Sequence, residues 1–105
     1  MPPMEPFDAF TRATVDQVFG ELWTRDAVSV RDRRLMTLSI IAALGSEHEA
    51  GVHIKAALES GDVSPTEMME LVLHVASYAG FPRASAFYRQ FRRLAGELGL
   101  EVPAI

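Results

Sequence analysis

Two glutamate–histidine pairs are the residues of this chain best suited to acid–base chemistry. Glu49 precedes His53 by four positions, and Glu70 precedes His74 by four positions, with Tyr78 four positions further on. If both segments are helical, each carboxylate lies one turn before its imidazole on the same face. A carboxylate so placed orients the ring and raises its proton affinity, which suits proton transfer near neutral pH. Either pair taken alone can equally be a simple hydrogen bond on a helix, and that structural interpretation stays open.

The same residues do not have the spacing of a known metal site. His48 and His53 are five positions apart, so on a helix they lie roughly 140° apart and cannot easily bind one ion together. Helical two-metal proteins use a Glu-x-x-His spacing, and here each glutamate is one residue further away. We therefore expect no metal, and a metal held by the two pairs is a minor alternative.

Arginines are the candidate contacts to a small anionic substrate. Arg83 follows Pro82 at the expected start of a helix, where free backbone N–H groups also favour negative charge. Arg31, Arg33 and Arg34 form a second basic cluster. Most arginines so placed are solvated or paired with acids, so we expect roughly one of the three to bind a ligand.

Composition narrows the class of protein. The chain has 105 residues, 49% of them hydrophobic, and a formal net charge of -4, which fits one domain over residues 1–105 and disfavours nucleic acid or an anionic membrane as the main partner. The basic group Arg89, Arg92 and Arg93 matches no nucleic-acid-binding motif, so we expect a solvated helix face. No apolar stretch reaches the roughly 18 residues that span a bilayer, and the N-terminus lacks the pattern of a signal peptide. We expect a cytoplasmic protein.

Five helices and no strands are expected to position these residues, because glycine and proline interrupt the apolar periodicity at intervals typical of helices. The predicted ranges are about 7–23, 30–44, 47–60, 65–79 and 82–98. Ser64, Pro65 and Glu67 form a complete helix-start signal. The second helix is apolar nearly all round, which in a short chain suggests burial against a second subunit. His53 and His74 fall on predicted apolar stripes, so we expect both imidazoles to be partly sheltered from water.

Three segments of the chain resemble one known family. They are R-D-R-R-L-M-T-L-S-I-I-A-A-L-G, then E-x-x-x-H-I-K-A-A-L-E-S-G, and S-P-T-E-M-M-E-L-V-L-H-V-A-S-Y-A-G-F-P-R-A. Over about residues 30–98 they are similar to the carboxymuconolactone decarboxylase family, within the alkylhydroperoxidase D-like fold. The resemblance implies an all-α bundle of about five to six helices and a homo-oligomer, commonly a trimer or hexamer.

The resemblance also implies a cofactor-independent carboxy-lyase of aromatic-compound catabolism. The namesake activity converts 4-carboxymuconolactone to 3-oxoadipate enol-lactone with release of carbon dioxide. In that reaction His53, assisted by Glu49, would supply the proton that replaces the lost carboxylate. His74 or Tyr78, in the ladder that begins at Glu70, would polarise the lactone carbonyl, and Arg83 would hold a carboxylate.

The chain departs at two places from the motifs of the family that it resembles. The redox branch uses C-x-x-C-x-x-x-H, and aligning its histidine with His53 puts Ser46 and Glu49 where the cysteines would be. A thiol peroxidase or disulfide reductase is therefore excluded, since the chain has no cysteine. Arg34 stands where many relatives have an acidic residue, and we count it as a second candidate substrate contact. The alternative function is a non-catalytic or ligand-binding member whose Glu/His pairs stabilise the oligomer.

Overall fold

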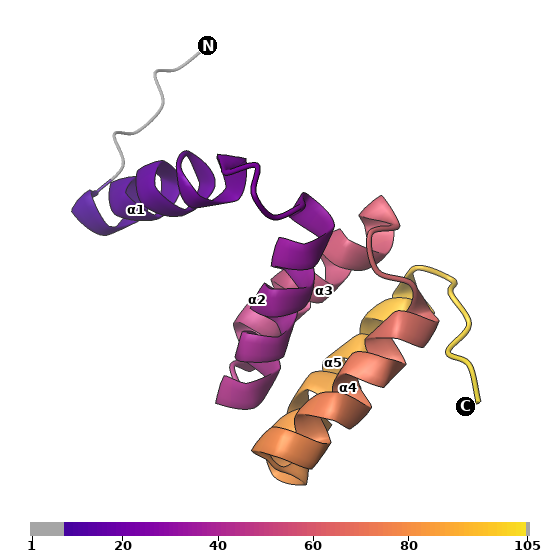
Figure 1. The fold of residues 1–105 in the computed structure, drawn as a ribbon. Coiled ribbons are helices and arrows are strands. Elements are labelled where there is room, and N and C mark those ends of the chain that lie inside the picture. The colour runs from indigo at the N-terminus through magenta and orange to yellow at the C-terminus, as the bar shows by residue number, and fades with distance from the viewer. Residues whose placement is uncertain (1–7, 105) are drawn as a thin grey trace. The chain divides into compact units, whose positions relative to one another are not determined.

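The computed structural model describes residues 8–104, and within that range the chain is all-α, without a strand, as the sequence predicts (Figure 1). The chain divides into two compact units, an N-terminal unit up to Val30 and a core unit from Arg31 onward. None of the described helices combines the length and the apolarity that a membrane crossing needs.

The N-terminal unit contains three short helical segments where the sequence predicts one helix over residues 7–23. They are the α-helix α1 (Ala9–Ala13), the π-helix η1 (Thr14–Phe19) and the 3₁₀-helix η2 (Leu22–Thr24). Asp8 caps the first of them, because its Oδ1 accepts a hydrogen bond from the Thr11 backbone N–H at 2.7 Å. The π-helix η1 ends at Gly20. A side chain does not fit at this position, because a Cβ would lie 2.8 Å from the Asp16 carbonyl oxygen. Phe7, the predicted first residue, lies outside the described range.

Four longer helices make up the core unit and follow the predicted ranges within two residues. They are α2 (Val30–Leu44), α3 (Glu47–Ser60), α4 (Pro65–Ala79) and α5 (Phe81–Glu97). α5 packs against both α4 and α3 (Figure 1). The connections between helices are short, so their ends are fixed by local signals in the turns.

The turn between α3 and α4 contains a helix stop and a helix start in direct succession. α3 ends at Gly61, whose φ of 77° is in the left-handed region that favours glycine. α4 starts with the predicted capping box: the Ser64 hydroxyl accepts from the Glu67 N–H, and the Glu67 carboxylate accepts from the Ser64 N–H, both at 3.1 Å. Asp62 and Val63 lie between Gly61 and the capping box, and the Val63 side chain is fully buried.

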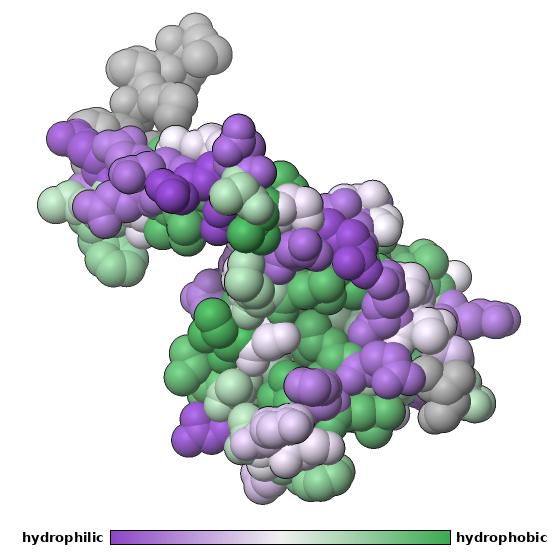
Figure 2. Space-filling model, viewed as in Figure 1, coloured by the Kyte–Doolittle hydropathy of each residue, from purple (hydrophilic) through white to green (hydrophobic). Residues whose placement is uncertain are grey.

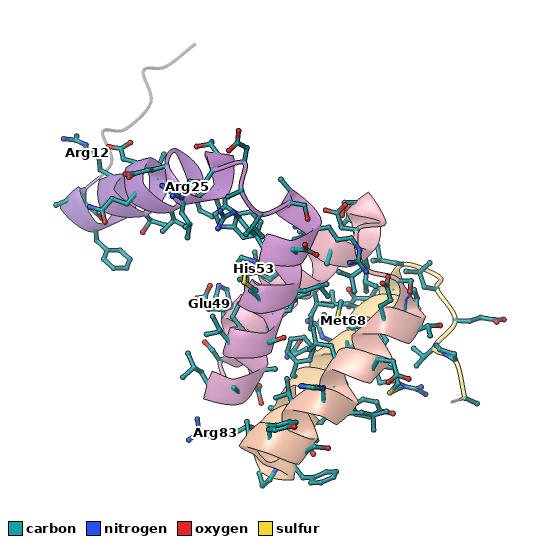
Figure 3. All side chains as sticks on the ribbon, viewed as in Figure 1. Arg12, Arg25, Glu49, His53, Met68 and Arg83 are labelled. Carbon is teal, nitrogen blue, oxygen red and sulfur yellow. The ribbon has the colours of Figure 1, made fainter. Side chains whose placement is uncertain are left out.

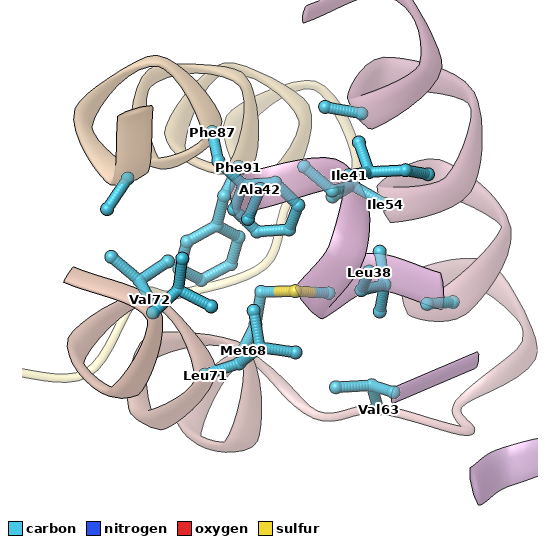
Figure 4. Close-up of a cluster of buried hydrophobic side chains, with 14 of the residues drawn as sticks. Leu38, Ile41, Ala42, Ile54, Val63, Met68, Leu71, Val72, Phe87 and Phe91 are labelled. Carbon is cyan, nitrogen blue, oxygen red and sulfur yellow. The ribbon is translucent and has the colours of Figure 1, made fainter. Parts of the chain in front are cut away.

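The core is apolar and lies between the four helices of the core unit. Its largest fully buried side chains are Phe87, Phe91, Leu38, Ile54, Met68 and Val63 (Figure 4). On α5 the buried residues Ala84, Phe87, Phe91 and Leu94 recur at helical spacing. Among the described residues the core contains no buried polar or charged residue. Chemistry must therefore take place at its edge.

One face of α2 is not covered by the other helices of the core unit. Leu38, Ile41 and Ala42 are buried, whereas Met36, Ile40 and Leu44 are 47%, 60% and 65% exposed. Apolar side chains accordingly lie at the surface of the core unit (Figure 2). The burial of α2 against a second subunit stays a prediction, because the structure contains one chain.

Candidate functional site

The first of the predicted Glu/His pairs lies at the edge of the core. Glu49 and His53 both come from α3 and are labelled in Figure 3. The His53 side chain is half-buried, as the sequence predicts, while Glu49 is exposed. The pair therefore places a sheltered imidazole next to a carboxylate in contact with water.

The electrostatic surroundings of His53 favour the neutral imidazole. Burial lowers the pKa of His53 below its usual value of 6.5, because a charged ring is poorly solvated there. The Glu49 carboxylate raises this pKa and so offsets part of the effect, whereas the Arg34 guanidinium lowers it further. Protonated His53 is consequently a stronger acid than a fully solvated protonated histidine.

Arg34 is held next to this histidine by a residue that the sequence did not single out. Its Nε donates a hydrogen bond to Oδ2 of Asp62 at 2.6 Å. The two side chains are 22% and 32% exposed, so the ion pair is largely sheltered. We call His53, Glu49, Arg34 and Asp62 the His53 cluster. Nothing in the local sequence points to Asp62, because its partner is 28 positions away.

The neighbouring arginine of the basic cluster has a structural role. Arg31 forms an ion pair with Glu67, the glutamate of the α4 capping box, and lies 3.7 Å from the Asp32 carboxylate. Hydrogen bonding from the Ser64 backbone lowers the pKa of Glu67, and the charge of Arg31 lowers it further. Arg31 thus ties the start of α2 to the start of α4.

Arg83 lies at the opposite end of α2 from Arg34. Its Nη1 donates to the backbone carbonyl of Ala43 at 3.0 Å, in the last turn of α2 (Figure 3). Such a bond satisfies a carbonyl that has no partner inside the helix. Arg34 and Ala43 are nine positions apart, which is about 13 Å along a helix axis. Within one chain, then, Arg83 and Arg34 do not converge on one small carboxylate.

The second predicted Glu/His pair is on the outer face of α4. Glu70, His74 and Tyr78 are exposed, and the His74 and Tyr78 rings stack with centroids 5.0 Å apart. The prediction that His74 is sheltered is wrong for the single chain. The buried stripe of α4 is instead Met68, Leu71, Val72, Val75 and Ala76. α4 is apolar over so much of its circumference that periodicity alone fits more than one stripe.

No metal centre is formed by the residues that the structure describes. Between residues 8 and 104 there is no group of three or more histidine or acidic side chains placed to hold an ion. Because His53 is half-buried and His74 faces outward, the two pairs do not share a site within one chain.

Comparison with known proteins agrees with the resemblance of the sequence segments. A sequence model of the Carboxymuconolactone decarboxylase family matches residues 8–93. The chain belongs to this family. The match also includes the N-terminal unit, which the resemblance over residues 30–98 left out. The absence of cysteine places the chain in the cysteine-less branch of the family.

Two curated relatives are themselves named as decarboxylases. The chain is 34% identical over 82 residues to the 4-carboxymuconolactone decarboxylase of Acinetobacter baylyi, covering 78% of this chain and 60% of the relative. It is 36% identical over 64 residues to the nitrosuccinic acid decarboxylase of Metarhizium robertsii, covering 61% of this chain and 44% of the relative. The chain thus spans less than two thirds of either relative. No solved structure gives a significant match.

Proposed function

We propose that this protein is a cofactor-independent carboxy-lyase that removes carbon dioxide from a carboxylated lactone or a related small carboxylate. The observation that supports the proposal most directly is the His53 cluster, in which a half-buried imidazole feels the charges of the Glu49 carboxylate and of the Arg34 guanidinium. The two relatives named as decarboxylases support the same reaction class. That the protein is cytoplasmic, and that it acts in the catabolism of aromatic compounds, remain predictions from the sequence.

The decarboxylation has two requirements. The negative charge left on carbon must be delocalised, and this carbon must then receive a proton. When the bond to the carboxylate breaks, carbon dioxide leaves and the electron pair remains on carbon, delocalised into an adjacent carbonyl as an enolate. In our proposal protonated His53 then donates its proton to that carbon and becomes neutral. The burial that lowers its pKa favours this transfer, and Glu49 stabilises the imidazolium before it. Water restores the proton for the next turnover.

Arg34 is proposed to hold a substrate oxygen that is retained. A guanidinium that bound the departing carboxylate would stabilise the ground state and slow the loss of carbon dioxide. Arg34 is therefore assigned to a second carboxylate or to the carbonyl oxygen on which the enolate charge develops.

The remaining predicted site residues require a neighbouring subunit. Glu70, His74 and Tyr78 face outward, and Arg83 binds the end of α2, so they can contribute to the His53 cluster only across an interface. We propose that the protein is a homo-oligomer, a trimer or hexamer, in which the uncovered face of α2 is buried. The roles of His74 or Tyr78 in polarising a carbonyl, and of Arg83 in holding a carboxylate, belong to that assembly.

Carbon dioxide release tests the proposal. The assay uses 4-carboxymuconolactone and related carboxylated lactones with the unaltered protein and with His53→Gln. We expect turnover by the former and a loss of about 10²- to 10⁴-fold in the variant, the usual contribution of a positioned acid or base. His48→Gln is the matched control, because His48 is exposed on the same helix and should retain full turnover. A folded His53→Gln protein with undiminished turnover would refute the role of His53.

The alternative is a non-catalytic or ligand-binding protein. The sheltered Arg34–Asp62 ion pair favours it, because such a pair can also serve only to join α2 to the α3–α4 turn. In that case no lactone would release carbon dioxide, and His53→Gln would lower the melting temperature without affecting any reaction.

A further inference from the structure

We infer that Asp62 is a positioning residue: it takes the Nε edge of the Arg34 guanidinium and leaves the outer edge, formed by the two terminal amino groups, for a carboxylate bound beside His53. The inference rests on the proposed function for the idea that a carboxylate ligand binds there. In the reaction proposed above, Asp62 has no role and the orientation of the Arg34 guanidinium is not specified.

The contact between Arg34 and Asp62 occupies only one side of the guanidinium. The bond is 2.6 Å long and runs from Nε to Oδ2, which is the distance of a charge-assisted hydrogen bond. Among residues 8–104 no other acceptor side chain lies in hydrogen-bonding or ion-pair distance of Arg34. A guanidinium can bind a second carboxylate through its two terminal amino groups at the same time, with two parallel hydrogen bonds.

The backbone that carries the Asp62 carboxylate is fixed by local contacts. Its backbone N–H donates to the Ser60 hydroxyl at 3.2 Å, and the preceding Gly61 has the left-handed conformation that ends α3. The following Val63 is fully buried, and the capping box starts at Ser64. Asp62 is therefore anchored from both sides, and it can restrict the rotation of the long Arg34 side chain before a ligand arrives.

Asp62 can affect anion binding at Arg34 in two ways, through its charge or by orienting the guanidinium, and the two effects have opposite signs. A carboxylate next to a guanidinium partly cancels its charge, so by Coulomb's law alone Asp62 should weaken the binding of an anion. If the role of Asp62 is instead to orient the guanidinium, any group that accepts from Nε should suffice. Asparagine keeps an acceptor oxygen without the charge, and alanine removes both.

The test compares Asp62→Asn with Asp62→Ala, using succinate as the carboxylate probe. Binding is followed by NMR through the shifts of the His53 imidazole and of the Arg34 Nε–H. We expect Asp62→Asn to bind succinate at least as tightly as the unaltered protein. Asp62→Ala should bind about tenfold more weakly and should lose the slowly exchanging Nε–H signal. Glu59→Ala is the control, since it removes a carboxylate from an exposed ion pair with Lys55.

A double-mutant cycle addresses the possibility that Asp62→Ala acts by loosening the fold. In an Arg34→Gln background the Asp62→Ala change should have no further effect on succinate binding, because the group that it positions is gone. Equal effects of Asp62→Ala with and without Arg34 would overturn the inference. Unchanged binding in Asp62→Ala, or no succinate-induced shift at His53 in the unaltered protein, would also overturn it. Failure of the decarboxylase proposal is a separate outcome, namely no carbon dioxide release while succinate binding still depends on Asp62.

Discussion

At the residue scale, burial is what separates His53 from the other two histidines. His48 and His74 are exposed, and His74 stacks on Tyr78, whereas His53 is half-buried. Burial lowers the pKa of His53, the Glu49 carboxylate raises it and the Arg34 guanidinium lowers it, so the shift comes from what surrounds this ring. Two predictions follow from these surroundings.

The first concerns the pKa of His53. Because Glu49 raises this pKa and Arg34 lowers it, Glu49→Gln should move it further below 6.5 and Arg34→Gln should move it upward. Both shifts can be read from the pH titration of the imidazole Cε1–H signal by NMR. Shifts in the opposite directions would contradict the arrangement of charges described above.

The second concerns stability in mild acid. In the folded protein the pKa of His53 lies below 6.5, so between these two values the unfolded chain binds more protons. The contribution of His53 to the free energy of unfolding is therefore complete above pH 6.5 and is lost as pH falls through the folded-state pKa. Urea unfolding of the unaltered protein and of His53→Gln, measured at several pH values from 7.5 down to 5, checks this. The variant should lose less stability over this range, and identical slopes would show that His53 does not contribute.

At the element scale, α4 shows both the strength and the limit of local sequence signals. Its start at Ser64 and Pro65 is fixed by neighbours within three residues, and the structure has the predicted capping box. The prediction that His74 lies on its apolar stripe is wrong, because apolar residues occur on several sides of α4 and only packing, in part against α5, selects the buried stripe.

The capping box gives a prediction for α4. Ser64→Ala removes the acceptor for the Glu67 N–H and should lower the free energy of unfolding by about 1 kcal/mol. Chemical denaturation at neutral pH measures the change. Ser77→Ala is the matched control on the same helix, since its exposed hydroxyl bonds only the Leu73 carbonyl and its loss should cost about 0.5 kcal/mol or less. Equal losses in the two variants would mean that the cap does not stabilise α4.

At the scale of the whole molecule, large apolar side chains are exposed in both units of the chain. No residue between positions 8 and 30 is buried, and Met36, Ile40 and Leu44 form an exposed stripe along two turns of α2. Contiguous apolar surface of this kind is typical of subunit interfaces. It supports the proposed homo-oligomer, in which residues on outer faces could complete the His53 cluster.

The exposed stripe of α2 gives the corresponding prediction. Ile40→Glu places a charge in the middle of the stripe and should shift the protein from an oligomer to a smaller species, because an unpaired charge is costly to bury. Light scattering coupled to size-exclusion chromatography measures the mass. Thr66→Glu, an exposed position at the start of α4, is the control and should leave the mass unchanged. An oligomer that survives Ile40→Glu would place the interface elsewhere.

The sequence by itself determined what depends on near neighbours. Helix ranges, the capping box at Ser64, the half-burial of His53 and the exclusion of thiol chemistry all follow from residue types and from spacings of a few positions. The family could be recognised for the same reason, since its segments are local.

Only the tertiary structure decided which distant residues meet. The Arg34–Asp62 pair joins positions 28 apart, and the bond from Arg83 to the Ala43 carbonyl joins positions 40 apart. Periodicity records which residues share a face of one helix, but it does not record how that helix is rotated against its neighbours. This is why it placed His53 correctly, placed His74 on the wrong side of α4, and gave no indication of Asp62.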